Sequence, residues 1–494
     1  MQPVSSTSAP VRIAVAKGDG IGPEIMEAVL SIFQAAQVNL TYQFVEMGKQ
    51  WFEKGISSGM TPEAKEAVEQ TGILFKGPME TPKGKGVKSL NVTARKVWNT
   101  YANKRVFKTL PGVATLYSRA GIPVDITIVR ENIEDTYGGI EHQLTHDVAL
   151  CRRFITRPGS LQVHRYAFEM ARRKGAKKIV CGHKANIMKL TDGLFLDCFY
   201  EVAREYPELE AGDIIVDDLA MKLVTGPEHF EVVVLPNLQG DIISDLCAGL
   251  VGGLGFAPSA NIGDYVAIFE AVHGTAPDIA GQNRANPTAL LLSGTMLLRH
   301  VGLPDKASQI EEALLTTLEA GIHTADVGPD RSRAVSTTAF AQAIIENLAI
   351  KPAGGKHRAE AVREKTLTLP LPPAENRLLV SPKTGPEKIV GVDLFVESDR
   401  SPEWLAATFE KLLPAHLRLV TISNRGTQVW PTKSVFTDCI NQYRVRVESN
   451  GLAPLAQSEC LDLAQRIAIA IKICSLEMLM QYGDRKGYTL AQGQ

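Results

Sequence analysis

The chain has 494 residues, of which 45% are apolar and 22% charged, and its formal net charge is −1. This length predicts two or three domains, and the composition is typical of a globular protein. The charge gives no indication of a nucleic acid or a membrane surface as a partner. No apolar run reaches the roughly 20 residues of a membrane-spanning helix. The first ten residues lack a signal-peptide core, and the seven cysteines are scattered, so we expect a cytoplasmic protein with reduced thiols.

The N-terminal stretch predicts a strand, a glycine-rich turn and a helix. The strand is expected at 11–16, the turn at 17–24, and the helix after it. The turn lacks the third glycine of G-x-G-x-x-G, because Pro23 stands in its place, so the Rossmann fingerprint is rejected. Either the turn binds a polar ligand through free N–H groups, or its glycines only permit a tight turn.

Strand-like and helical patterns alternate as far as about residue 350, which predicts an α/β architecture. The expected strands include 41–45, 72–75, 126–130, 178–181, 213–216, 232–235 and 265–270.

Three arginines, Arg95, Arg105 and Arg130, lie within 36 residues of sequence. Ser89 is a plausible N-cap that would place Arg95 on a helix. Planar guanidinium groups bind carboxylates bidentately, so this set would suit a small anion with several carboxylates. Surface ion pairs are the alternative. Tyr137, beside two glycines, would by default be a half-buried aromatic residue.

Asp241 and Asp245 follow a buried apolar strand and are four residues apart. If Asp241 opens a helix, both carboxylates lie on one face, where Mg²⁺ or Mn²⁺ could bridge them. The alternative is an N-cap and a solvated charge. Lys184 and Asp217 also follow expected strands; a desolvated lysine at such a position could act in proton transfer, although a solvated one is commoner.

Seven segments in order resemble the β-decarboxylating dehydrogenases, and within them isocitrate dehydrogenase. They are GDGIGPEI, SLNVTAR, the Arg105 segment, RENIEDTYGG, HKANIMK, NLQGDIISD and EAVHGTAPDIAG, spanning residues 11–349. The resemblance implies a two-domain fold that is not a Rossmann fold. The large domain would comprise 1–99 and 252–350, and the small domain 100–251. The long loop after residue 270 would be functional.

The resemblance also implies the site residues. Isocitrate would be bound by Ser89, Asn91, Arg95, Arg105, Arg130, Tyr137, Lys184 and Asn186. Asp241 and Asp245 would bind Mg²⁺ or Mn²⁺ with Asp217 of a partner subunit, and Lys184 and Asn186 would also come from that subunit, so a homodimer is expected. The dinucleotide would contact His273, Gly274, Thr275, Ala276, Asp278, Ile279, Asn286 and Asp326.

The implied reaction belongs to the tricarboxylic acid cycle. Hydride would pass from C2 of isocitrate to a nicotinamide, and the β-carboxylate would then leave as CO₂. Lys184, with Asp217 nearby, would help to remove the hydroxyl proton, and Tyr137 would protonate the enol at C3.

The cofactor is expected to be NAD. NADP-dependent relatives carry a Lys-Tyr pair after HGTAP and an arginine further on, whereas this chain has Asp278, Ile279 and Pro329. A carboxylate about 4 Å from a 2′-phosphate costs on the order of 4 kcal/mol at an effective dielectric constant near 20. Arg284 would soften this discrimination. The alternative is that Asp278 caps the loop.

A linker is expected at 351–386 and a small α+β domain at 387–494, resembling the additional domain of longer bacterial isocitrate dehydrogenases. In that domain we expect strands at 389–396, 417–422 and 443–447, a helix at 402–413 and a long helix at 458–480. Subunit contact is its expected role, with a regulatory site as the alternative.

Two other functions stay open at this point. The chain could act on homoisocitrate, 3-isopropylmalate or tartrate, against which Ser89 and Asn91 argue. It could also be a non-catalytic regulatory subunit, which the presence of Tyr137, Lys184 and the aspartates disfavours.

Overall fold

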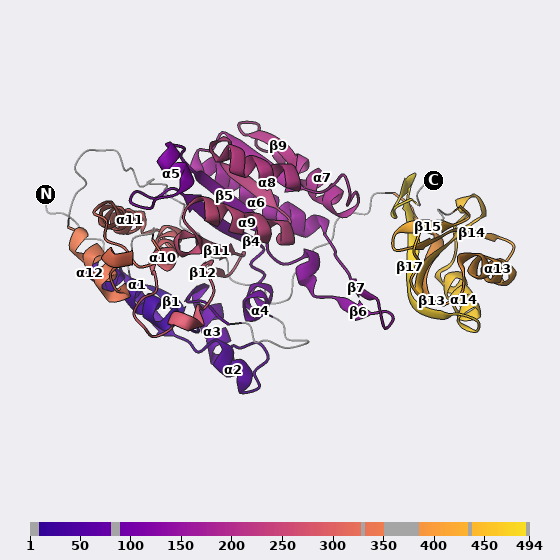
Figure 1. Ribbon diagram of the computed structural model, residues 1–494, viewed down its shortest axis with the longest axis horizontal. Coiled ribbons are helices and arrows are strands. Elements are labelled where there is room, and N and C mark those ends of the chain that lie inside the picture. The colour runs from indigo at the N-terminus through magenta and orange to yellow at the C-terminus, as the bar shows by residue number, and fades with distance from the viewer. Residues whose placement is uncertain (1–8, 81–88, 328–330, 350–384, 433–436, 491–494) are drawn as a thin grey trace. The chain divides into compact units, whose positions relative to one another are not determined.

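The structure is a computed structural model that describes residues 9–80, 89–327, 331–349, 385–432 and 437–490 (Figure 1). The chain divides into two compact units. The first takes its described residues from Met1–Gly138, Phe154–Ile187 and Asp192–Leu379, and the second from Gly139–Arg153, Met188–Thr191 and Val380–Gln494. The predicted linker, apart from its last two residues, and Pro329 lie outside the described residues.

A ten-stranded mixed sheet forms the centre of the first unit, which confirms the α/β prediction. Its order is β2-β1-β3-β12-β11-β4-β5-β10-β8-β9. Strand β4 runs antiparallel to β5 and β11, and β11 runs antiparallel to β12. The bounds are β1 Val11–Ala16, β2 Leu40–Phe44, β3 Ile73–Lys76, β4 Ala102–Lys108, β5 Asp125–Glu131, β8 Lys178–His183, β9 Glu210–Ile215, β10 Val232–Leu235, β11 Pro258–Ile262 and β12 Ala267–Ala271.

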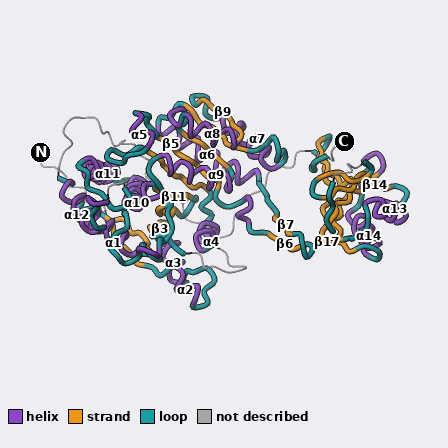
Figure 2. Tube along the Cα trace, viewed as in Figure 1, coloured by secondary structure: helices purple, strands orange, loops and turns teal. Residues whose placement is uncertain are grey.

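Helices cover both faces of this sheet. Ile13 and Val15 belong to one core cluster, and Ala14 and Ala16 to another, because successive residues of a strand point to opposite faces. Figures 1 and 2 show α10 and α12 beside α1, although they follow it by hundreds of residues. The helices are α1 Gly22–Ala35, α2 Lys49–Glu53, α3 Pro62–Thr71, α4 Leu90–Val97, α5 Leu116–Ala120, α6 Arg157–Lys174, α7 Thr191–Ala203, α8 Val216–Thr225, α9 Asn237–Leu250, α10 Thr288–His300, α11 Pro304–Glu319 and α12 Thr337–Asn347.

Three neighbouring parallel strands, β5, β10 and β8, end at one edge of the sheet. The segments that follow them contain Tyr137, the two aspartates of α9, and Lys184. Carboxyl ends of parallel strands are where α/β proteins gather functional side chains. Three motifs that are far apart in the sequence therefore begin at one edge of the sheet. The two predicted α/β domains share this continuous sheet, and their boundaries stay a prediction.

The second unit contains a six-stranded sheet of order β15-β14-β16-β13-β17-β18 and the small β6–β7 hairpin. Its elements are β6 Glu141–Gln143, β7 Ala149–Cys151, β13 Glu387–Glu397, α13 Pro402–Leu412, β14 Leu417–Asn424, β15 Thr427–Trp430, β16 Gln442–Ser449, α14 Gln457–Ala468, β17 Lys472–Tyr482 and β18 Arg485–Lys486. The central β-α-β-β-α-β order is the ferredoxin-like arrangement, with β15 and β18 added at the edges.

The prediction of a long helix at 458–480 is wrong. Helix α14 ends at Ala468, and residues 472–482 form β17, which pairs antiparallel with β13 along its length. Leu, Met and Glu favour a helix locally, but pairing with a buried central strand outweighs that weak preference. No helix among the described residues has the length and apolar character needed to cross a membrane.

Candidate active site

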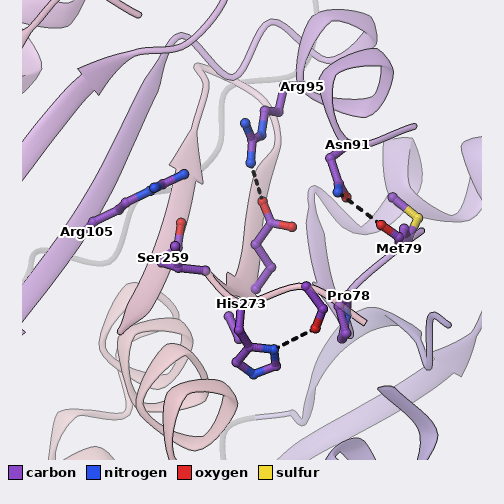
Figure 3. A pocket seen from close by; sticks show the side chains of 11 residues that line it. Pro78, Met79, Asn91, Arg95, Arg105, Ser259 and His273 are labelled. Carbon is purple, nitrogen blue, oxygen red and sulfur yellow. Dashed lines mark hydrogen bonds and ion pairs between the residues drawn. The ribbon is translucent and has the colours of Figure 1, made fainter. Parts of the chain in front are cut away.

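Three arginines from three different elements interact electrostatically, and two of them line one cavity. Arg95 comes from α4, Arg105 from β4 and Arg130 from β5. Arg95 and Arg105 line a cavity of about 90 Å³, into which their side chains point (Figure 3). Arg130 is 1% exposed, and its charge acts on Arg105. The geometry supports an anion site rather than three independent surface ion pairs.

The guanidinium groups are held by neutral partners as well as by carboxylates. Arg105 Nε donates to Asn103 Oδ1 at 2.8 Å, and its Nη1 donates to Ser244 Oγ at 2.7 Å. Arg130 Nε and Nη2 donate to Asn237 Oδ1 at 2.9 and 2.7 Å. These amide and hydroxyl partners orient the guanidinium groups without neutralising their charges. Burial, with the charges of Arg130 and Arg95, lowers the pKa of Arg105 to about 10.

Both aspartates lie on α9, one turn apart, as predicted. The helix begins at Asn237, however, so Asp241 is in its second turn and does not cap it. Asp241 pairs with Arg130, and its Oδ1 lies 3.4 Å from Arg105 Nη2. Burial opposes ionisation of Asp241, but Arg130 and Arg105 outweigh it and lower its pKa. Burial raises the pKa of Asp245, whose Oδ1 lies 3.5 Å from Arg105 Nη1.

Tyr137 lies against this cluster. It belongs to the 3-10 helix η1, Asp135–Gly138, and its hydroxyl donates to Asp241 Oδ2. The Arg130 guanidinium carbon is 4.8 Å from the centre of its ring. Burial, with the hydrogen bond to Asp241, raises the phenol pKa, so the group keeps its proton at neutral pH. The structure therefore places a neutral phenol beside a carboxylate and an arginine.

Lys184 and Asp217 form an ion pair with each other. The hydrogen bond from Lys184 lowers the pKa of Asp217. Asn186 is exposed in the turn after Lys184. Within the described parts of this single chain, no group of three or more histidine, cysteine, aspartate or glutamate residues is arranged to hold a metal. The oxygen donors of Asp241 and Asp245 fit Mg²⁺ or Mn²⁺, with two protein ligands from one chain.

Asn91 and Arg95 lie one turn apart on α4 and line the cavity together. Ser89 stands at the N-cap position, but its side chain makes no capping hydrogen bond to the helix. Asn91 accepts a hydrogen bond at 2.9 Å from Lys76 Nζ, and Arg95 Nη2 lies 3.0 Å from Glu270 Oε1.

Lys76 and Glu270 were not predicted as site residues. Lys76 ends β3, is 1% exposed and pairs with Glu270. Burial disfavours the charged carboxylate, but Lys76 and Arg95 outweigh burial and hold the pKa of Glu270 well below its usual range. The sequence signal was a charged residue ending an otherwise apolar strand, because such a charge is buried only when it is paired.

Two of the predicted dinucleotide residues lie in the wall of the cavity. His273 and Gly274 line it, and burial lowers the pKa of His273. The His273 Nε2 atom is buried without a hydrogen-bond partner in the described structure, which fits a polar ligand at this position. Asn286 Nδ2 donates to Asp326 Oδ2 at 3.0 Å.

Asp278 is exposed on the 3-10 helix η4, Pro277–Ile279, and Ile279 is partly buried. Thr275 is buried, and Ala276 is exposed with a φ of 38°. Arg284 Nη1 donates to Gln282 Oε1 at 3.2 Å. Asp278 thus presents its carboxylate on the surface of the loop after HGTAP.

The N-terminal glycine turn is packed against this loop. The N–H groups of Asp19 and Ile21 donate to Pro78 O and Thr275 O at 2.7 and 2.9 Å. A Cβ on Gly20, whose φ is 60°, would lie 2.1 Å from Thr275 O. These contacts favour the tight-turn interpretation, since both N–H groups already have acceptors.

Two known protein families match consecutive parts of this chain. The family described as isocitrate/isopropylmalate dehydrogenase matches residues 12–344, and the family described as bacterial isocitrate dehydrogenase, C-terminal domain, matches residues 387–494. The chain belongs to the isocitrate/isopropylmalate dehydrogenase family.

One relative within this family covers nearly the whole chain, and another covers about two thirds of it. An isocitrate dehydrogenase [NADP] of Thermus thermophilus is 46% identical over 485 residues, covering 98% of this chain and 96% of the relative. An Arabidopsis thaliana mitochondrial isocitrate dehydrogenase [NAD] catalytic subunit is 48% identical over 345 residues, covering 69% and 90%. A crystal structure of a protein from Thermus thermophilus matches with a TM-score of 0.88 and 45% identity, covering 98% and 96%.

Proposed function

We propose that this chain is an isocitrate dehydrogenase that oxidises and decarboxylates isocitrate to 2-oxoglutarate and CO₂, with NAD and Mg²⁺ or Mn²⁺. The observation that carries the proposal is the convergence of Arg95, Arg105 and Arg130 with Asp241 and Tyr137. A tricarboxylate needs several positive donors, and the reaction needs carboxylates for a metal and a proton donor for the enol.

In this proposal the arginines bind and orient the substrate carboxylates, and Asn91 adds an amide donor. Asp241 and Asp245 would hold the metal, which when bound polarises the oxygen substituent at C2. Tyr137, neutral because burial raises its pKa, delivers the proton to C3 after CO₂ has left. Lys184 and Asp217 exchange the proton of the substrate hydroxyl through their ion pair.

The proposed active form is a homodimer in which Lys184, Asn186 and Asp217 serve the partner's site. Two observations support it. Lys184 and Asp217 pair with each other, and not with Asp241 or Asp245, among the described residues. Helices α8 and α9 also expose large apolar side chains: Met221, Val224, Leu238 and Ile242. Such a patch is typical of a protein interface.

The proposed cofactor is NAD. The exposed Asp278 carboxylate would accept hydrogen bonds from a ribose with free hydroxyls and repel a 2′-phosphate. The name of the Arabidopsis relative contains NAD, and that of the Thermus relative contains NADP.

The test is the initial rate of reduction of NAD and of NADP, measured separately with isocitrate and Mn²⁺ or Mg²⁺. EDTA and 3-isopropylmalate serve as controls. We expect metal-dependent turnover of isocitrate that is at least about tenfold faster with NAD, which is a difference of about 1.4 kcal/mol. Preference for NADP would overturn the cofactor proposal alone. Absence of turnover with either cofactor would overturn the proposed reaction.

A further inference from the structure

Two side chains connect the segment that carries Arg130 and Tyr137 to the first turn of α9. One is Asp135, on the η1 side, and the other is Asn237, the first residue of α9. Asp135 is 0% exposed and Asn237 is 1% exposed. Neither belongs to the substrate, metal or cofactor residues of the proposed function.

Asp135 makes the connection from the tyrosine side. Its Oδ2 accepts a hydrogen bond from the N–H of Leu238 at 3.1 Å, and its Oδ1 accepts one from the N–H of Thr136 at 2.7 Å. The N–H of Asp135 itself donates to Phe154 O at 3.0 Å. Asp135 has a φ of 66°, a left-handed conformation that aspartate tolerates better than most residues.

The bond to Leu238 satisfies an N–H in the first turn of α9, where a negative charge is also favoured by the helix dipole. A free N–H at this place could be capped by any nearby acceptor. Here the acceptor is two residues from Tyr137, and the capped turn is directly followed by the turn that carries Asp241. The cap therefore couples the two partners of the Tyr137–Asp241 hydrogen bond.

Asn237 makes the connection in the opposite direction. Its Oδ1 accepts from both Nε and Nη2 of Arg130, and its Nδ2 donates to Glu134 O at 3.2 Å. With two donors converging on one oxygen, the guanidinium plane of Arg130 is held in a single orientation. Gly240 allows α9 to lie close to this side chain, since a Cβ there would lie 2.7 Å from Arg130 Cγ.

We infer that Asp135 and Asn237 are positioning residues for the proposed reaction: Asp135 sets Tyr137 against Asp241, and Asn237 sets the orientation of Arg130. The inference rests on the proposed function and adds to it a division of labour. Asp135 acts through the proton donor, and Asn237 acts through a substrate-binding arginine.

This division predicts different kinetic effects. Asp135→Gly removes both carboxylate acceptors, and glycine adopts a positive φ without strain. The effect of this variant therefore reports the lost hydrogen bonds and not backbone strain. It should lower kcat by about tenfold or more, with KM for isocitrate changed less than about threefold. Asn237→Ala should raise KM by about tenfold with a smaller change in kcat, because Arg130 loses its fixed orientation.

The deciding readout isolates the step at C3. The wild-type chain and its variants are incubated in D₂O with 2-oxoglutarate, Mn²⁺ or Mg²⁺ and the reduced dinucleotide, and loss of the C3 proton signal is followed by NMR. Removal of that proton is the reverse of enol protonation, so it requires Tyr137 but no hydride transfer. We expect Asp135→Gly to slow this exchange in parallel with Tyr137→Phe, while Asn237→Ala exchanges at a near wild-type rate at saturating 2-oxoglutarate.

Two further variants control for lost stability. Asp135→Asn keeps an acceptor oxygen and tolerance of positive φ, and it should retain exchange within about threefold of wild type. Asp393→Asn disturbs a buried aspartate of the second unit, which pairs with Arg446 at 2.8 Å, and should lower the Tm without changing exchange.

Wild-type rates of exchange and kcat in Asp135→Gly would overturn the inference, as would equal losses in Asp135→Gly and Asp135→Asn. An unchanged KM in Asn237→Ala would overturn the part that concerns Arg130. If the wild-type chain does not turn over isocitrate, the proposed function itself fails, and the inference fails with it.

Discussion

Lys184 forms an ion pair with Asp217, a predicted metal ligand. Asp217 lies on α8, whereas Asp241 lies on α9. Asp241 in turn pairs with Arg130. If both pairs take part in the proposed reaction, each chain holds two incomplete sets of groups, and each set needs its complement from a second copy.

Mixed dimers test this arrangement. Lys184→Met and Asp241→Asn should each abolish activity when assayed alone. If sites are shared, denaturing and refolding an equal mixture should restore about a quarter of the wild-type activity, because half of the dimers are mixed and each regains one intact site. Mixing Asp241→Asn with Asp245→Asn is the matched control, since both changes affect the same half-site. Recovery equal to that of the control would show that each site is built from one chain.

Tyr137→Phe should lower kcat by about 10²- to 10⁴-fold, the usual contribution of a general acid, with a smaller effect on KM. The phenol donates to Asp241 and burial raises its pKa, so it carries its proton at neutral pH and can act as the acid. Steady-state kinetics, with the Tm measured in parallel, would check this. A variant with kcat within about threefold of wild type would exclude Tyr137 as the acid.

Asp278→Lys should shift cofactor preference toward NADP. The change replaces repulsion between Asp278 and the 2′-phosphate of NADP with attraction, and solvent screens both because the position is exposed. The kcat/KM for NAD divided by that for NADP should fall by at least about tenfold. Asp278→Asn only removes the charge, so its ratio should lie between those of the wild type and Asp278→Lys. An unchanged ratio in both variants would show that Asp278 only shapes the loop.

The stability of the chain should fall as pH rises toward 8, and Glu131 should contribute to this. Burial, with the charge of Glu134, raises the pKa of Glu131 to about 8, above its ordinary value in the unfolded chain. The folded state therefore binds the proton more tightly, so the contribution is fully present below about pH 4.3 and is lost as pH rises to about 8.

Glu131→Gln removes this dependence. Compared with wild type, the variant should gain stability at pH 8.5 relative to pH 5.5, by more than about 1 kcal/mol, since one pKa unit corresponds to about 1.4 kcal/mol. Urea unfolding at the two pH values would measure it. If the stability difference between variant and wild type is the same at both pH values, Glu131 is ionised in the folded protein.

Local pattern was enough for most of the strands. The strand predicted at 11–16 is β1, and those predicted at 126–130 and 232–235 are β5 and β10, because runs of β-branched residues between turns have few other solutions. The strand predicted at 213–216 is shifted: β9 is Glu210–Ile215, and Val216 already belongs to α8. Ends of elements depend on contacts that local pattern does not contain.

The four-residue spacing of Asp241 and Asp245 was sufficient to place both on one face of a helix, because that periodicity is intrinsic to the α-helix. The buried pair of Lys76 and Glu270 was not predictable in the same way: these residues are 194 positions apart in the sequence and become partners only because β3 and β12 are neighbours in the sheet. The β17 segment shows the same limit, since its partner strand β13 overrode a helical composition.

The sequence by itself determined the motifs, their chemistry and the family, because residue type and local spacing define donors, acceptors and periodicity. Only the tertiary structure decided that Arg130 faces Asp241, that Asp135 caps α9, and that Lys184 pairs with Asp217. These contacts join strands and helices separated along the chain. Their free energies depend on burial and on neighbouring charges, which exist only once the sheet has formed.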